Sequence, residues 1–122
     1  MEFLNKEHEN NFNLLVKKAK LGSADIEEKT MFYIIAGNRD LMNQVEKIYD
    51  FKENWLQDSE VNEDGERYFK GVLTSSGSKR LLNLATQLYN NFNEQSVLDT
   101  FSYLDKENRK LALNAIKLRF DF

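Results

Sequence analysis

The chain offers few side chains for nucleophilic or metal chemistry, because its 122 residues include one histidine and no cysteine. The histidine, His8, stands between Glu7 and Glu9, where a carboxylate could orient the ring as a general base. No local motif fixes a serine nucleophile beside it, and acidic residues are common in a first helical turn because they complement the helix dipole. We therefore expect His8 to be a solvent-exposed residue of a first turn.

The same composition argues against a metal centre or a bound cofactor. Disulfides, thiolate-bound zinc and iron–sulfur clusters need cysteine, and paired-histidine sites need a second histidine. Carboxylates are dense between Asp58 and Glu66, but the glycine of a calcium-binding EF-hand loop would have to stand two residues earlier. We interpret this segment as a solvated acidic loop and expect no metal, no cofactor and no catalytic residue. A small enzyme whose carboxylates, distant in sequence, meet only in the fold is a further alternative.

The segment from Ser75 to Arg80 places hydroxyl groups, a glycine and two cations before a predicted helix. Free backbone N–H groups at a helix N-terminus can bind an anion. The full phosphate-loop pattern is absent, and ordinary capping explains the serines. A small-ligand or anion-binding domain remains an alternative, with Ser75, Ser76, Lys79 and Arg80 as its binding residues.

Aromatic side chains bracket the acidic loop and are the clearest candidates for a contact surface. Tyr49, Phe51 and Trp55 precede the loop, and Tyr68 and Phe69 follow it. Aromatic residues are enriched in interface hot spots because they bury a large area at a small entropic cost, and they also close helical cores. We predict a non-enzymatic protein-interaction module, with core packing of the aromatics as the alternative. Its predicted partner-binding residues are Tyr49, Phe51, Trp55, Glu60, Glu63 and Asp64.

The charge balance disfavours nucleic acid and anionic membranes as partners, because 17 basic and 20 acidic residues give a net charge of −3. A helix-turn-helix around Gly37 is a further alternative, but its second helix, Asp40 to Tyr49, has a mixed and slightly acidic outer face. The longest apolar stretch, Thr30 to Asn38, is too short to span a membrane, and the N-terminus lacks the pattern of a secretory signal. We expect a cytoplasmic protein.

The spacing of apolar residues predicts three helices in the first half of the chain. The first begins at a capping Asn5 and ends at Gly22 in a left-handed turn. The second opens with a capping-box pattern, Asp25 and Glu28, and is apolar all round, which indicates a central position. The third is the amphipathic segment from Asp40 to Tyr49.

Three further helices are predicted after Thr74. The serines before Lys79 cap one that runs to Phe92, and Ser96 caps a short one that carries Val97 and Leu98. Asp105 caps the last, whose buried stripe ends at Phe120. The buried residues expected on the two long helices are Leu81, Leu82, Ala85, Leu88, Tyr89 and Phe92, then Leu111, Ala112, Ala115, Ile116 and Phe120.

The segment between these groups, from Asp50 to Gly77, is predicted to be irregular. Asp64-Gly65 is a favourable turn dipeptide, so Val61 and the residues after Arg67 could form one short β-hairpin. An irregular loop is the alternative. The fold class is therefore all-α or mostly α, a compact bundle of about six helices in one domain, 1–122, with a mobile acidic loop at 57–66.

Several segments resemble those of small uncharacterised bacterial proteins, the domain-of-unknown-function families. The segments are 3–8, 32–38 with Leu41, 48–51 and 111–120, and the resemblance covers nearly the whole chain apart from the acidic centre. Such families occur mainly in low-GC Gram-positive genomes and on their mobile elements. The resemblance brings no catalytic residue, and it implies a phage or mobile-element protein that binds another protein, for example a host defence factor.

Overall fold

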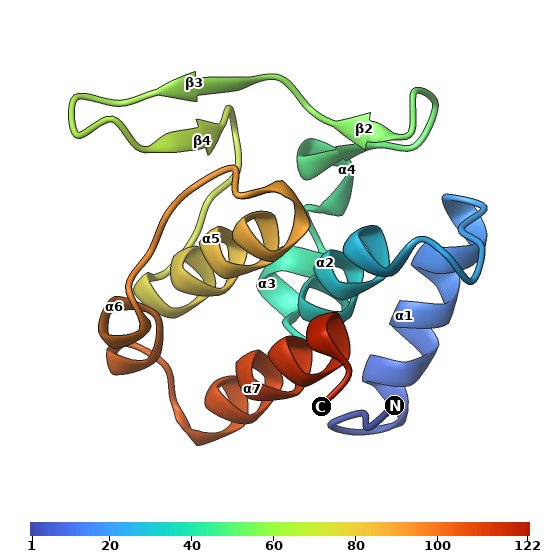
Figure 1. The fold of residues 1–122 in the computed structure, drawn as a ribbon. Helices are drawn as coiled ribbons and strands as arrows, with labels where there is room; N and C mark the ends of the chain where they lie inside the picture. Colours follow the sequence, from blue (N-terminus) through green and yellow to red (C-terminus); the bar gives the residue numbers. More distant parts are fainter.

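Helix α2 (Ile26–Ala36) runs through the middle of the molecule, and the other elements pack around it (Figure 1). The computed structural model describes residues 1–122 and contains seven helices and two antiparallel strand pairs. The remaining helices are α1 Lys6–Lys18, α3 Arg39–Met42, α4 Val45–Ile48, α5 Ser76–Asn90, α6 Val97–Ser102 and α7 Lys106–Phe120. The strands are β1 Tyr49–Asp50, β2 Trp55–Leu56, β3 Ser59–Val61 and β4 Arg67–Phe69. The prediction of a mostly α fold is confirmed.

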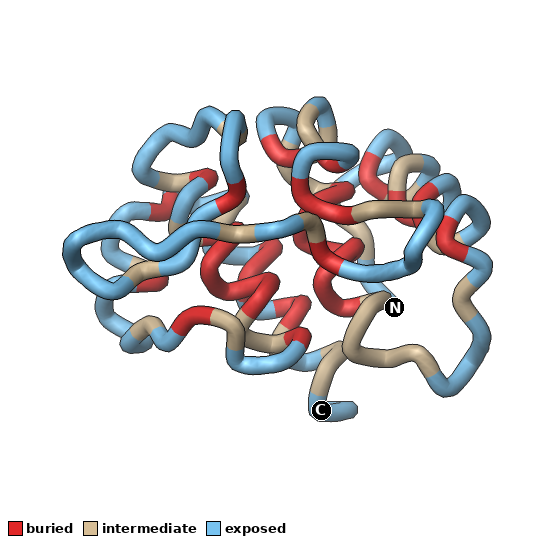
Figure 2. Tube along the Cα trace, turned by 90° about the horizontal axis from the view of Figure 1, so that it is seen from above, coloured by how far each residue is buried: buried red, intermediate tan, exposed pale blue.

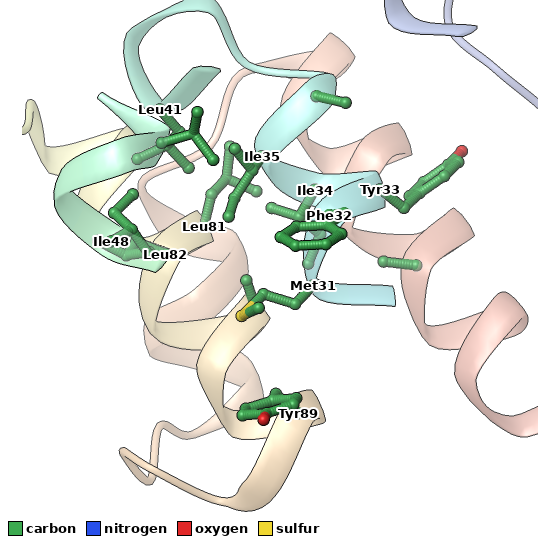
Figure 3. Close-up of a cluster of buried hydrophobic side chains, with 14 of the residues drawn as sticks. Met31, Phe32, Tyr33, Ile34, Ile35, Leu41, Ile48, Leu81, Leu82 and Tyr89 are labelled. Carbon is green, nitrogen blue, oxygen red and sulfur yellow. The ribbon is translucent and has the colours of Figure 1, made fainter. Parts of the chain in front are cut away.

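The residues of α2 from Thr30 to Ala36 are all buried, as the apolar pattern predicts. Figure 3 shows Met31, Phe32, Ile34 and Ile35 among side chains of α3, α4 and α5, while Tyr33 points away from that cluster. Burying each large apolar side chain stabilises the fold by about 1.5–3 kcal/mol. Helix α2 is therefore in contact with neighbours on several sides: α1, α5 and α7 all pack against it.

Four predicted helix caps form. The side chains of Asn5, Ser75, Ser96 and Asp105 each accept a hydrogen bond from the backbone N–H three residues later. One predicted boundary and one predicted capping bond are wrong. Helix α1 ends at Lys18, and Lys20, not Gly22, takes the left-handed conformation, with φ 56°. The Asp25 carboxylate accepts from the Gly22 N–H at 2.6 Å instead of capping α2.

The predicted third helix, Asp40 to Tyr49, does not form as one element. It divides into α3 and α4, and Tyr49 begins strand β1. At the break, the Gln44 amide binds both backbone groups of Leu73: Nε2 donates to the carbonyl and Oε1 accepts from the N–H, each at 2.7 Å. This partner is distant in sequence, so helical spacing alone could not reveal it. Leu41, Val45 and Ile48 are nevertheless buried, as their spacing indicates.

The irregular centre contains more strand than predicted. Strands β3 and β4 pair with Val61 opposite Arg67, which confirms the hairpin around Asp64-Gly65. A second pair, β1 with β2, joins Tyr49 to Leu56 and Asp50 to Trp55; at two residues a strand it is too short to be recognised by alternation. The β3–β4 hairpin is largely exposed (Figure 2). No helix combines the length and apolar character that crossing a bilayer requires.

Three large apolar residues of the predicted helices lie on the surface, and one of them, Phe120, was expected to be buried. Val97 and Leu98 are exposed because the six-residue helix α6 buries only Thr100 fully, and Phe101 only in part. Phe120 is exposed because it is the last residue of α7, where its ring contacts Phe122 instead of the bundle. The residues Leu111, Ala112 and Ala115 of the same stripe are buried as predicted.

Gly37 follows α2, at a point where side chains of α1 and α7 approach its backbone. A Cβ atom at this position would lie 2.5 Å from Leu111 Cδ1 and 3.0 Å from His8 Nε2. Its φ of −88° is allowed to any residue, so the lack of a side chain, not the backbone conformation, explains the glycine. The close approach holds α1, α2 and α7 together at one end of the bundle.

We expect Gly37→Ala to lower the free energy of unfolding by about 1–3 kcal/mol, because the added methyl group overpacks the contact with Leu111. Chemical denaturation measures the change. Gly22→Ala is the matched control, since a Cβ there meets nothing closer than an Asp25 oxygen at 3.7 Å. Equal stability of the two variants would contradict the packing argument.

Candidate protein-contact surface

The β1–β2 turn divides the three aromatic residues that precede the acidic loop. The Asp50 carboxylate accepts hydrogen bonds from the N–H groups of Lys52 and Glu53 at 2.9 and 3.1 Å, and Asn54 adopts a left-handed conformation with φ 53°. Because side chains alternate along a strand, this turn directs Tyr49 and Leu56 inward and Trp55 outward.

Tyr49 belongs to the core, so the prediction that it contacts a partner is wrong. Only 1% of its surface is exposed, and its ring packs edge-on against Phe32 and Phe51, with centroids 4.9 and 5.1 Å away. Burial raises the pKa of Tyr49 to about 12. Phe51 is half-buried against Phe32, and the Lys18 ammonium group lies 4.6 Å from its ring centroid. Core packing, the alternative considered for these aromatics, accounts for both residues.

Trp55 is 59% exposed, although it is the largest side chain in the segment. Its only aromatic contact is with Tyr89, at 6.0 Å between ring centroids. Val61 and Tyr68, on the neighbouring hairpin, are 54% and 42% exposed. Three large apolar side chains therefore face solvent on the segment from β2 to β4.

The hairpin is fastened to the helices by buried amides. The Asn93 side chain accepts from the Arg67 N–H at 3.0 Å and donates to the Arg67 carbonyl at 2.9 Å, as a neighbouring strand would. Asn93 also donates to Asn83 of α5 at 3.3 Å. Beside it, the rings of Phe69 and Phe92 are stacked 5.3 Å apart at an angle of 3°. These contacts anchor β4 to the helices. Strand β3 and the turn are attached to the bundle through β4 and project away from it.

Hydrogen bonds give the turn at the end of the hairpin a defined conformation. The Asn62 side chain accepts from the N–H groups of Asp64 and Glu66, both at 3.0 Å, and Gly65 takes the φ of 79° that the turn requires. The Glu66 carboxylate forms an ion pair with Lys79 of α5 at 2.9 Å. The acidic segment is thus a structured turn with one link to the helices.

The acidic residues of this segment differ in their partners. Tyr68 donates its hydroxyl proton to Glu60 at 2.8 Å, and this hydrogen bond raises the pKa of Tyr68. Asp58, Glu63 and Asp64 are exposed and form no ion pair. Exposed carboxylates thus occur on the same segment, from β2 to β4, as exposed apolar side chains. We call this set the hairpin surface; its members are Trp55, Glu60, Val61, Glu63, Asp64 and Tyr68.

The residues of the alternative anion site do not converge. Ser75 and Ser78 cap each other, and the Ser78 hydroxyl group donates to the Asp40 carboxylate at 2.6 Å, so an internal anion already lies at this helix N-terminus. Lys79 is paired with Glu66, and the Arg80 guanidinium lies over the Tyr103 ring at 4.9 Å. Ser76 is exposed without a hydrogen bond. The serines therefore act as caps.

His8 is buried, with 2% of its surface exposed, so the prediction of a solvated first-turn residue is wrong. Its Nδ1 accepts from the Leu4 N–H at 3.1 Å, and its Nε2 donates to the Tyr33 carbonyl oxygen at 2.8 Å. Both bonds need the neutral ring with its proton on Nε2. The ring joins the N-terminal segment to α2, and neither nitrogen is free for catalysis. The rings of Phe3 and Tyr33 pack against His8, with centroids 5.1 and 4.5 Å away, and shield it from the water that its acidic neighbours in sequence had suggested.

A polar cleft of about 420 Å³ lies above His8, among the first turns of α1 and α7 and the start of α3. It contains the carboxylates of Glu7, Asp105 and Glu107. Glu7 is paired with Arg39 at 2.8 Å, and that hydrogen bond lowers the pKa of Glu7. A general acid would need a raised pKa. No group of three or more histidine, cysteine or acidic residues in the chain is arranged to hold a metal ion.

The outer face of the predicted recognition helix is occupied by internal contacts. Glu46 pairs with Lys18 at 2.8 Å, Lys47 donates to the Gly71 carbonyl, and Gln44 binds Leu73. With α3 and α4 only four residues long each, no helix of the length that reads a DNA groove forms at 40–49.

The fold and this surface define a mostly α protein with an exposed acidic hairpin. The chain belongs to the family of unknown function DUF6075, whose model matches residues 1–121. This agrees with the resemblance to a domain-of-unknown-function family. No curated protein and no solved structure is detectably similar to the chain.

We expect Asn93→Ala to lower the free energy of unfolding by about 1–3 kcal/mol, because it leaves the Arg67 backbone groups and Asn83 without their partner. Amide hydrogen exchange should become faster across 59–69 in particular. Asn13→Ala, at an exposed helical position, is the control and should leave both measurements nearly unchanged. If amide exchange across 59–69 has the same rates in Asn93→Ala and Asn13→Ala, Asn93 does not anchor the hairpin.

His8 should make stability depend on pH, because burial lowers its pKa below the ordinary value of 6.5. The stabilisation is complete above pH 6.5 and is lost as the pH falls from there through the folded-state pKa, since the unfolded chain binds the proton more readily. The slope is at most about 1.4 kcal/mol per pH unit.

The measurement is denaturant unfolding between roughly pH 7.5 and 5.5, around the ordinary histidine pKa. His8→Gln serves as the comparison, because it keeps every carboxylate and removes the only histidine. The variant should be less stable at neutral pH and lack the slope. A slope that persists in His8→Gln would assign the effect to other groups.

Proposed function

We propose that this chain is a non-enzymatic protein-interaction module that contacts its partner through the hairpin surface. The observation that carries the proposal is the exposure of Trp55 on β2, followed along the chain by exposed Val61 and Tyr68 on a hairpin whose base is fixed by Asn93. A rigid, exposed tryptophan loses little conformational freedom on binding, which is why tryptophan is enriched in hot spots.

The unpaired carboxylates of the segment from β2 to β4 support a partner with a basic surface. Asp58, Glu63 and Asp64 have no internal cation, so a partner's lysine or arginine side chains could approach them without breaking an existing pair. Such complementarity mainly raises the association rate and fixes orientation, while the apolar contacts supply most of the affinity. We therefore expect binding to weaken as salt is added.

The biological setting is part of the same proposal. Following the resemblance of the sequence, we place the chain in the cytoplasm of a low-GC Gram-positive bacterium, encoded by a phage or other mobile element. Its partner would be a host protein, such as a defence factor, whose activity it changes by binding. The genes that neighbour its own in such genomes give a direct check on this setting.

Trp55→Ala should abolish or weaken partner binding at least about tenfold, a loss of 1.4 kcal/mol or more. It should change the free energy of unfolding by less than about 1 kcal/mol, because the side chain is mostly exposed. The tagged protein is used to retrieve partners from its native host, and the affinity of each purified partner is then measured for both forms.

Leu14→Ala is the control for this experiment, because Leu14 is 57% exposed on α1 and lies outside the hairpin surface. Its partner affinity should equal that of the unmodified protein. A large loss of stability in Trp55→Ala with affinity retained would overturn the proposal and assign Trp55 to packing.

A further inference from the structure

A second surface, distant from the hairpin, combines exposed apolar and unpaired basic side chains. It is an open groove of about 950 Å³ between the N-terminal segment, the end of α6 and the first half of α7. In Figure 1 the first half of α7 lies at the bottom of the molecule, and strands β3 and β4 lie at the top. The two surfaces can therefore be occupied at the same time.

The apolar part of the groove comes from three separate segments. Leu4 and Phe101 are partly buried at its sides, and Leu113 is 48% exposed on α7. Val97 and Leu98 stand one helical turn before Phe101 on the same side of α6, and are 77% and 75% exposed. Val97 and Leu98 do not line the groove itself. Large exposed apolar patches mark interaction sites on soluble proteins, and the apolar residues of the groove are a candidate for such a site.

The rim of the groove is basic, although the whole chain carries a net charge of −3. Lys106, Arg109 and Lys110 line it, with Glu107 as the one acid, and none of the three cations forms an ion pair. Arg109 is held by a hydrogen bond from its Nε to the Phe101 carbonyl at 3.1 Å, which leaves the rest of its guanidinium group available. Most charged residues elsewhere along α1 and α5 have closer internal partners, for example Lys18 and Lys79.

We propose that this groove binds an acidic, apolar segment of a protein, in which large apolar side chains contact Leu4, Phe101 and Leu113 and flanking carboxylates meet Lys106, Arg109 and Lys110. The basic rim favours acidic partners. The apolar floor favours a polypeptide over nucleic acid, because a phosphate backbone would need cations at the positions that Leu4 and Leu113 occupy. A membrane surface would need a broader apolar face than one groove supplies.

This inference goes beyond the proposed hairpin interaction and does not depend on it. A chain with an acidic contact surface at one end and a basic groove at the other would join two partners of opposite charge. Variants in the groove leave Trp55 and the hairpin unchanged, so the two proposals can fail separately.

The test is a selection of short random peptides displayed on phage against the full-length protein, with Leu113→Glu as the counter-selection. Glutamate is a good helix former, so this exchange removes the apolar floor and adds a repelling charge without disturbing α7. Selected peptides are then synthesised with a fluorescent label, and their binding is measured by anisotropy for the unmodified protein, Leu113→Glu, and Lys106→Glu with Lys110→Glu. Leu14→Glu is the matched control on another helix, and circular dichroism verifies that each variant is folded.

The expected result is a set of peptides rich in aspartate or glutamate and in large apolar residues. Their affinity should fall at least about tenfold in both groove variants, stay unchanged in Leu14→Glu, and weaken with salt. Failure to enrich any peptide, or enrichment of basic or groove-independent peptides, would overturn the proposal. So would stronger binding of a labelled single-stranded oligonucleotide or of phosphatidylserine vesicles, tested in parallel, if either is lost in Lys106→Glu with Lys110→Glu.

Discussion

The burial of α2 is the constraint on which the rest of the structure depends. A helix that is apolar on every side must be covered on every side, and no single neighbour can do this. Helices α1, α5 and α7 therefore pack around it, and the short elements α3, α4 and β1 fill the remaining space with Leu41, Ile48 and Tyr49. Because these segments are used to complete the core, their aromatic residues are not available to a partner.

The features that could be predicted from the sequence are those set by local chemistry. Capping residues such as Asn5 and Asp105, the apolar run of α2 and the Asp64-Gly65 turn each act within a few residues, so their outcome can be read from neighbouring positions. The spacing of apolar residues also gave the correct inward face for 41–48, even though the helix there is interrupted.

The features that could not be predicted depend on partners far along the chain. His8 has the neighbours of a solvated residue, yet the Tyr33 carbonyl and the ring of Phe3 enclose it. Trp55 and Tyr49 are alike in sequence terms, and a two-residue strand pair decides which of them faces solvent. The anchoring role of Asn93 could not be predicted, because the chain contains many asparagines and only the structure places this one opposite Arg67. Four of the six predicted contact residues, Trp55, Glu60, Glu63 and Asp64, are therefore exposed, and the local pattern does not separate them from the buried Tyr49 and the half-buried Phe51.

The pair of hydrogen bonds between the Gln44 side chain and the Leu73 backbone affects which changes of chain length this fold tolerates. These two hydrogen bonds hold together the two ends of the segment 45–72, which contains both strand pairs. The helices are therefore packed together independently of the length of that segment. Lengthening a flexible connection costs little once its ends are held, about 0.6 kcal/mol for each doubling. The segment 45–72 can then gain or lose residues at the turn between β3 and β4 without a large loss in the free energy of unfolding of the helical bundle. One helical core could in this way carry outer turns of different length and charge.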